Sequence, residues 1–243
     1  MCGDPAPSRR RRTAAWSVHA FTAFGAVCCL LALGAAADND WRRMFAWLAV
    51  AVIVDALDGT LARAAQVKQV LPHFDGTMLD SIIDYVSYVL VPAFAIGRSQ
   101  LMPPSLAWPV ASLVCLASAY QFCQTDAKTE DHFFKGFPSY WNIVIFYLFI
   151  WQLPPLANSA IVLALIVLVF VPIKYVYPTR TATWRTATLV LSALWGATIG
   201  AMLWSFPRTP LWLANASLAY IAYYIALSVY LTATGGGRRD ATR

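Results

Sequence analysis

Charged residues are scarce in this 243-residue chain: Asp, Glu, Lys and Arg make up 12% of it, whereas hydrophobic residues make up 59%. A single soluble core cannot hide so large an apolar share, which excludes an ordinary water-soluble domain. Histidine is also rare, with three residues, and the five cysteines show no metal-ligand spacing, which argues against a zinc centre. The expected solvent for most of the chain is therefore a lipid bilayer.

What the chain has instead is a series of apolar runs. A helix needs about 20 apolar residues to cross the hydrocarbon layer, and runs of roughly this length recur along nearly the whole sequence. Short segments rich in Asp, Asn and Pro separate them. The pattern predicts an all-α, polytopic bundle of about eight spans, near residues 16–37, 42–64, 76–97, 106–124, 139–153, 157–176, 184–205 and 211–233.

The basic residues predict an orientation for these spans, because Lys and Arg concentrate in cytoplasmic loops. With the N-terminus inside, all but four of the 18 basic residues fall on the cytoplasmic side. The exceptions are Arg42, Arg43, Arg98 and Arg208. Both termini are therefore expected to be cytoplasmic, and the net charge of +6 indicates membrane topology and not a nucleic-acid partner.

This topology predicts one transmembrane catalytic domain over residues 16–233, between a basic N-terminal tail (1–15) and a C-terminal tail (234–243). A signal peptide is the alternative interpretation of residues 9–37, since an Arg-rich start, an apolar stretch and three alanines imitate its regions. The apolar stretch is too long for the core of such a peptide, and it contains His19. We therefore expect a membrane span.

Four aspartates interrupt the apolar pattern on two consecutive spans, and charges inside spans are costly. They are Asp55, Asp58, Asp80 and Asp84. Residues three or four apart share a helix face, so each span presents one acidic face, and the connection between the spans is long enough for a hairpin in which the two faces meet. Four acids are then expected to share one pocket.

Such a cluster repels itself unless protons or cations neutralise it. Mg²⁺ and Mn²⁺ prefer carboxylate oxygens, and two such ions can clamp a phosphoryl group. Gly59 and Gly76 leave room for a ligand, while Arg63 suits a phosphate oxygen. Helix packing and membrane anchoring are the simpler explanations for each of these three residues alone. Together they predict a site for a diphosphate and two divalent ions.

The residues resemble the signature of the CDP-alcohol phosphotransferase family, Asp-x-x-Asp-Gly-x-x-Ala-Arg, a spacer, then Gly-x-x-x-Asp-x-x-x-Asp. Asp55, Asp58, Gly59, Ala62, Arg63, Gly76, Asp80 and Asp84 occupy every fixed position. The spacer has twelve residues where most members have eight, which is similar to the bacterial phosphatidylcholine synthase branch. The likeness continues in Trp16–His19, Val70–Pro72 and the segment from Thr125 to Pro138.

The resemblance implies a membrane transferase that moves the phosphatidyl group of CDP-diacylglycerol to an alcohol and releases CMP. Asp55, Asp58 and Asp80 would bind two Mn²⁺ or Mg²⁺ ions, and Asp84 would complete the site and act as general base. Gly59, Ala62, Gly76 and Arg63 would bind CDP-diacylglycerol. The resemblance also implies a homodimer in the bacterial inner (plasma) membrane, with the active site facing the cytoplasm.

Choline is the expected acceptor, because the spacer and the loop resemble that branch. A quaternary ammonium is best held by aromatic faces, and the aromatic candidates are Tyr85, Tyr88, Tyr120, Phe133, Phe134 and Trp141. Aromatic residues at membrane interfaces are commonly anchors only. A polar cluster, Asp126 with Glu130, Asp131 and His132, could shape the acceptor entrance or be solvated loop.

Two alternatives remain open at this stage. Serine, inositol or glycerol phosphate could be the acceptor within the same reaction class. A cation-coupled transporter is the alternative from another class, since acids inside a bundle also bind and pass cations. Dependence on a CDP-lipid distinguishes the two classes.

Overall fold

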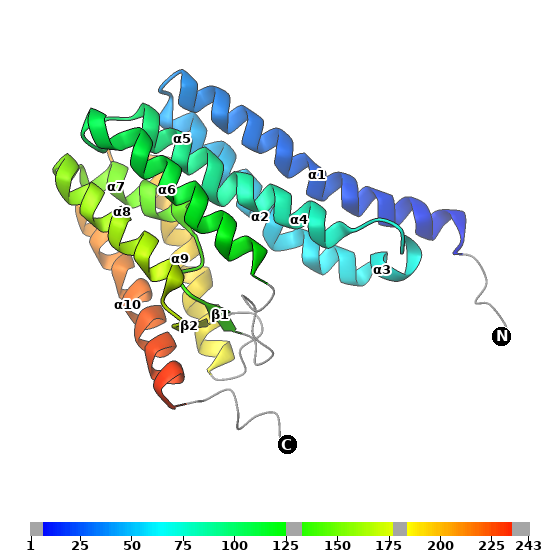
Figure 1. The fold of residues 1–243 in the computed structure, drawn as a ribbon. Helices are drawn as coiled ribbons and strands as arrows, with labels where there is room; N and C mark the ends of the chain where they lie inside the picture. The colour runs from blue at the N-terminus through cyan, green and yellow to red at the C-terminus, as the bar shows by residue number, and fades with distance from the viewer. Residues whose placement is uncertain (1–6, 125–132, 177–183, 235–243) are drawn as a thin grey trace. The chain divides into compact units, whose positions relative to one another are not determined.

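The computed structural model describes residues 7–124, 133–176 and 184–234. Nearly all of them are helical, as the apolar pattern predicts (Figure 1). The elements are α1 (Arg9–Ala37), α2 (Trp41–Ala64), α3 (Val67–Val70), α4 (Gly76–Asp84), the π-helix η1 (Tyr85–Leu90), α5 (Val91–Arg98), α6 (Pro104–Cys123), β1 (Phe133–Lys135), α7 (Trp141–Trp151), α8 (Pro155–Phe170), β2 (Lys174–Val176), α9 (Arg185–Ser205) and α10 (Leu211–Thr234).

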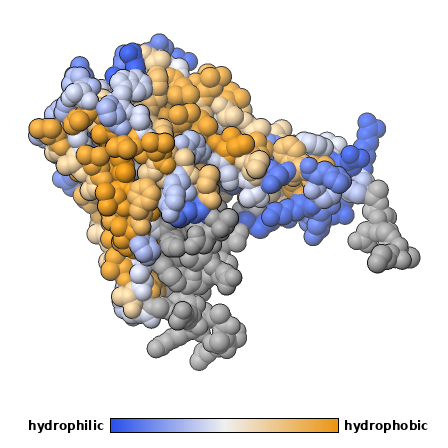
Figure 2. Space-filling model, viewed as in Figure 1, coloured by the Kyte–Doolittle hydropathy of each residue, from blue (hydrophilic) through white to orange (hydrophobic). Residues whose placement is uncertain are grey.

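A helix lies at each of the eight positions that the sequence predicts, although not all are equally long. Six are long and apolar enough to cross a membrane: α1, α2, the continuous helix Gly76–Arg98, α6, α9 and α10. Helices α7 and α8 are shorter, with 11 and 16 residues. Large apolar side chains such as Leu30, Leu116 and Trp204 are exposed on these helices, and Figure 2 shows extensive hydrophobic surface along them. Such surface suits contact with lipid tails.

Two observed boundaries differ from the predicted ones. The span expected over 157–176 ends at Phe170, because Pro172 cannot continue a helix, and the chain then forms β2. Strand β2 pairs antiparallel with β1 in a small ladder, which the periodicity did not predict. At the other end of the chain, α1 begins at Arg9, so the basic residues form the first turn of a helix instead of a separate tail.

The structure divides into two compact parts, residues 1–91 and 92–243. In the first part, α1 packs along α2, and α4 and η1 pack against α1. The tight turn between α1 and α2 contains Asn39 in the left-handed conformation (φ 58°), which asparagine tolerates well. Asp40 then caps α2 by accepting a hydrogen bond from the Arg43 N–H. These contacts hold the two helices that carry the acidic residues.

The twelve-residue spacer is not a simple connection, because it contains the short helix α3. Val67, Val70 and Leu71 bury their side chains against Ala15 of α1, and Ala62 packs against the same cluster. A left-handed residue, Gln66 (φ 51°), turns the chain between α2 and α3. The spacer thereby covers the N-terminal half of α1 before the chain enters α4.

In the second part, polar side chains link helices that are otherwise apolar. The Asn158 side-chain amide donates to the carbonyl of Leu101 at 2.8 Å, and the hydroxyls of Tyr147 and Ser217 lie 2.6 Å apart. Buried hydrogen bonds of this kind specify which helix faces meet in a bundle whose surroundings are as apolar as its core.

Candidate active site

Three of the four predicted aspartates come together in the first part. Asp55 lies on α2, and Asp80 and Asp84 lie one turn apart on α4. Each offers a carboxylate oxygen, and these oxygens all lie within 4.8 Å of one another. All three side chains are half-buried. The site is thus formed by one acid from α2 and two from α4.

Asp58, the fourth predicted ligand, is outside this set. Its side chain is buried, with 7% exposed, and has the Thr22 hydroxyl of α1 as a polar neighbour. A buried carboxylate needs such a partner. Asp58 therefore ties α2 to α1 in this structure, and its role as a metal ligand stays a prediction.

The start of α4 is fixed by Asp75, which the motif does not include. Its carboxylate accepts hydrogen bonds from the backbone N–H groups of Thr77 (2.9 Å) and Met78 (3.0 Å). This is an N-cap, which satisfies donors that have no partner inside the helix. The cap sets where the helix begins and thus which face carries Asp80 and Asp84. In the sequence, the signal for this N-cap is an Asp directly before the Gly-Thr pair with which the helix begins.

Gly76 lies against His19 of α1. A Cβ at this position would be 2.6 Å from the His19 Cε1, far closer than carbon atoms approach. His19 is itself buried against the ring of Phe74, with centroids 4.3 Å apart. Its Nε2 has no hydrogen-bond partner among the described residues. The glycine that the motif assigns to the CDP-lipid is therefore also required by the packing of α4 on α1.

Gly59, unlike Gly76, is not in close contact with a neighbouring helix. A Cβ on Gly59 would meet only the Arg63 guanidinium, at an ordinary 3.5 Å, so helix packing does not explain the glycine. Arg63 is exposed, and its guanidinium donates to the Thr60 hydroxyl at 3.0 Å. Gly59 and Arg63 are therefore both accessible to a phosphate group, the ligand that their spacing in the sequence predicts.

Tyr88 has a partner that the sequence did not reveal. Its phenol donates a hydrogen bond to Asp55 Oδ2 at 2.8 Å. The residue lies in η1, the π-helix that begins directly after Asp84 and in which the Val91 N–H bonds to the carbonyl of Val86. Such wide turns occur frequently at functional sites. Tyr85, in the same segment, is half-buried.

The other aromatic candidates for a choline site lie in the second part. Trp141 is completely buried, and its indole N–H donates to Ser118 at 2.8 Å. It is a packing residue of α7 and α6 and presents no face to a ligand. Tyr120 is half exposed and lies against Phe170, with ring centroids 5.1 Å apart. Phe133 and Phe134 form β1, and the structure describes only their backbone.

The predicted polar cluster from Asp126 to His132 lies outside the described residues.

The three carboxylates fit a hard divalent cation. Three negative oxygens at this separation repel one another in a half-buried place, and Mg²⁺ or Mn²⁺ takes carboxylate oxygens by preference. Within the described part of the chain, neither histidine nor cysteine joins the group, so its donors do not resemble those of a zinc centre. Asp55, Asp80 and Asp84 are therefore the residues that would hold the metal.

Comparison with known proteins agrees with this geometry. The family described as CDP-alcohol phosphatidyltransferase matches residues 17–234, which include all the helices that carry the site. A protein of Legionella pneumophila named phosphatidylcholine synthase is 41% identical over 227 residues, covering 90% of this chain and 89% of the relative.

Two further relatives carry the same name. The protein of Bradyrhizobium diazoefficiens is 44% identical over 189 residues, or 78% of this chain and 71% of the relative. The protein of Pseudomonas aeruginosa is 36% identical over 219 residues, which cover 90% of this chain and 92% of the relative. The similarity thus spans both parts of the structure and is not confined to the aspartate motif.

Proposed function

Because the chain belongs to the CDP-alcohol phosphatidyltransferase family, we propose that it transfers the phosphatidyl group of CDP-diacylglycerol to choline and releases CMP. The observation that carries the reaction class is the set of three carboxylates on α2 and α4, at positions of the family motif. Choline is supported by the names of the relatives and by the twelve-residue spacer.

In this reaction the choline hydroxyl oxygen attacks the β-phosphorus of CDP-diacylglycerol. The bond between that phosphorus and the bridging oxygen breaks, and CMP leaves with the electron pair. The hydroxyl proton passes to a carboxylate, which we assign to Asp84, the acid that lies last on α4 and next to η1. A half-buried carboxylate near other acids is a suitable proton acceptor.

Asp55 and Asp80 would hold divalent metal together with Asp84, and Asp58 would join them if α2 shifts relative to Thr22. A bound Mn²⁺ or Mg²⁺ pair would supply positive charge to the diphosphate oxygens. Tyr88 orients Asp55 through its hydrogen bond. Arg63, next to Gly59, would bind a phosphate oxygen, since a guanidinium pairs well with phosphate, and Ala62 and Gly76 would line the same site.

We further propose eight spans with both termini in the cytoplasm, with α7 and α8 as the two short ones. The distribution of basic residues supports this orientation. The same orientation places the acidic site at the cytoplasmic side of a bacterial inner membrane, where soluble CMP and choline are accessible. A homodimer and a single catalytic domain over residues 16–233 belong to the same proposal.

An acceptor screen tests the function. Purified protein in detergent would receive CDP-diacylglycerol, Mn²⁺ and labelled choline, serine, inositol or glycerol 3-phosphate, and both CMP release and labelled lipid would be measured. Choline is expected to give the only large signal. Release of CMP with another alcohol would keep the reaction class and replace the acceptor. Absence of CMP release with every alcohol would contradict the enzyme and make a cation transport assay the next experiment.

A further inference from the structure

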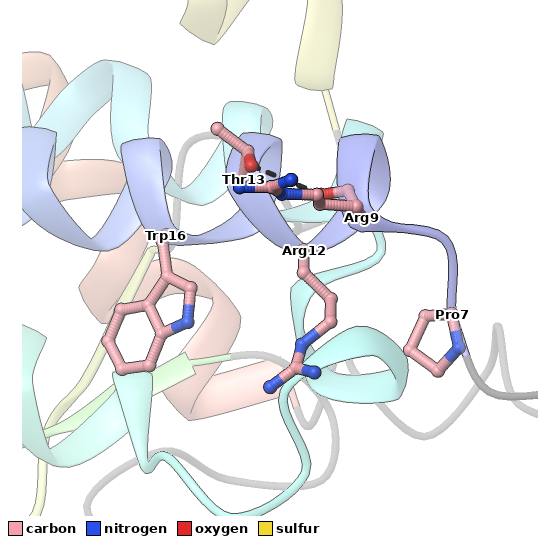
Figure 3. Close-up of a pocket in the computed structure, with 5 residues that line it drawn as sticks. All are labelled: Pro7, Arg9, Arg12, Thr13 and Trp16. Carbon is pink, nitrogen blue, oxygen red and sulfur yellow. Dashed lines mark hydrogen bonds between the residues drawn. The ribbon is translucent and has the colours of Figure 1, made fainter.

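An open groove of about 430 Å³ lies beside the first two turns of α1 (Figure 3). It is lined by Pro7, Arg9, Arg12, Thr13 and Trp16. The four helical residues follow one another at spacings of three, one and three, which places them on a single face of the helix. Figure 3 shows Arg12 and Trp16 extending from the same side of α1. None of these residues belongs to the aspartate site.

Among the described residues, the electrostatics at the start of α1 are unfavourable. The N-terminal end of a helix carries a partial positive charge, which favours acidic residues there. Helix α1 has no acidic residue in its first turn, and its first four residues are all arginine. Among the described residues, no carboxylate forms an ion pair with Arg9 or Arg12. An anion in the groove would relieve both the mutual repulsion of the guanidinium groups and their repulsion by the helix end.

The arginines of the groove are held in an outward orientation by contacts on the opposite face. The Arg11 guanidinium donates a hydrogen bond to the side-chain oxygen of Gln66, at the corner between α2 and α3. One turn further along, Ala15 is fully buried in the cluster with Val67 and Val70. Ala15 turns that face inward at its own position, whereas Arg9 and Arg12 are exposed on the other face.

The aromatic residue indicates what kind of anion the groove accommodates. Trp16 is 47% exposed and packs edge-on against Phe74, with centroids 5.2 Å apart. Tryptophan concentrates at the headgroup level of membranes, where its ring contacts apolar chains and its N–H contacts polar groups. In α1 it lies between the arginines and the apolar remainder of the span. A ligand on this face meets positive charge at one end and apolar surface at the other.

We propose that this groove binds the phosphate headgroup of an anionic glycerophospholipid from the adjacent leaflet, with the phosphate on Arg9 and Arg12 and the glycerol region against Trp16. The site rests on α1 being a membrane span and not on the acceptor alcohol or the catalytic residues. It would anchor and orient α1, which also carries the contacts of His19 with Gly76 and of Thr22 with Asp58.

Lipid binding by the purified, delipidated full-length protein tests this site. Native mass spectrometry would measure the affinity for phosphatidylglycerol and for zwitterionic phosphatidylcholine. The double variant R9Q/R12Q is expected to bind phosphatidylglycerol about ten- to thirty-fold more weakly than the wild type, since each basic residue near a membrane surface contributes about a factor of five. Trp16→Leu is expected to weaken binding by about two- to five-fold.

A matched control removes the same charge elsewhere. R10Q/R43Q alters two exposed arginines that do not line the groove, and its affinity is expected to fall by no more than about fivefold, since of the two only Arg10 lies at the same membrane surface as the groove. Equal loss in both double variants, or equal wild-type affinity for the two lipids, would overturn the site. Displacement of phosphatidylglycerol by inorganic phosphate alone would show a soluble-anion site, and binding of CDP-diacylglycerol alone would assign the groove to the substrate. CMP release by R9Q/R12Q in detergent shows that the variant is folded.

Discussion

The phenol of Tyr88 donates a 2.8 Å hydrogen bond to Asp55 Oδ2, and so joins η1 to the acid that α2 contributes to the site. Asp55 is the one member of the three-carboxylate set that does not share a helix with the others. The hydrogen bond therefore fixes the separation of the two helices at the point where a metal would bind. We therefore expect Tyr88 to position a metal ligand, whereas its contact with choline stays a prediction.

Tyr88→Phe is expected to raise the Mn²⁺ concentration for half-maximal activity by about ten-fold. A hydrogen bond to a charged group contributes about 1.5–3 kcal/mol, and its loss lets the Asp55 carboxylate reorient. Titration of activity with Mn²⁺ at saturating choline measures this effect, and Tyr85→Phe is the control on the same segment. An unchanged Mn²⁺ titration with a raised KM for choline would return Tyr88 to the choline site.

Asp84→Asn is expected to abolish turnover, by about 10³-fold or more, because the amide cannot accept the proton of the acceptor hydroxyl. Binding of CDP-diacylglycerol should remain measurable by equilibrium lipid-binding assays, since the phosphate contacts of Arg63 are unchanged. Ser81→Ala, on the exposed side of the same helix, should retain wild-type turnover. Normal turnover in the Asn variant would remove Asp84 from the role of base.

Gly76→Ala is expected to lower both thermal stability and activity, because the new methyl group would overlap the His19 ring. Overpacking of this kind costs about 1–3 kcal/mol. Differential scanning fluorimetry and CMP release would be measured together. The double variant Gly76→Ala with His19→Ala should recover stability, since the smaller residue on α1 makes room.

Gly59→Ala provides the contrast, because its methyl group would make only an ordinary contact with Arg63. We expect an unchanged melting temperature with reduced activity and a raised KM for CDP-diacylglycerol. Full activity in this variant would show that the glycine is not needed for substrate approach, whereas a lowered melting temperature would indicate packing that the structure does not contain.

Chelation of divalent ions is expected to abolish activity reversibly. Mn²⁺ or Mg²⁺ should restore it, because carboxylate oxygens favour hard cations. The wild type should also gain thermal stability from Mn²⁺: a ligand at 100 times its Kd stabilises the folded state by about 2.7 kcal/mol. The Asp80→Asn variant should gain much less, since it lacks one of the three charges. Equal stabilisation of both proteins would place the bound ion elsewhere.

Trp141→Phe tests the aromatic candidate that the structure places in the core. Loss of the indole N–H leaves Ser118 without this donor and should destabilise the protein by about 1–3 kcal/mol. The KM for choline should stay unchanged at a temperature where the variant is folded. A selective rise of that KM would contradict the assignment of Trp141 to packing.

Much of this site could be predicted because its signals are local. The spacing of Asp80 and Asp84 places them on one helix face, and apolar runs locate the helices that carry the acids. The contact of Tyr88 with Asp55 could not be predicted in this way, because it joins residues from two helices and depends on a π-helical turn that leaves no periodic signal. The contact of His19 with Gly76 could not be predicted either, because it also joins two helices. Gly76 is both a position of the motif and a packing contact of α4 with α1.

The sequence could not indicate features that depend on the surroundings of a residue. Trp141 resembles the other interfacial aromatics in the sequence, and only its burial next to Ser118 separates it from them. Asp58 shares a helix face with Asp55, yet it is buried near Thr22 of α1. The apolar run after Leu156 continues past Phe170; Pro172 indicates where the helix ends, but the composition does not indicate that a strand follows at Lys174.

The π-helical turn of η1 also makes the chain sensitive to its length at this point. A π-helix holds about one residue more per turn than an α-helix, and each residue of an α-helix turns the side chain by about 100°. Deleting one residue between Asp84 and Tyr88 would change the angle about the helix axis between the carboxylate and the phenol, and is expected to break the hydrogen bond of Tyr88 to Asp55. The link between α2 and η1 therefore depends on the length of this segment, and a one-residue deletion would break it while leaving every charged group of the motif in place.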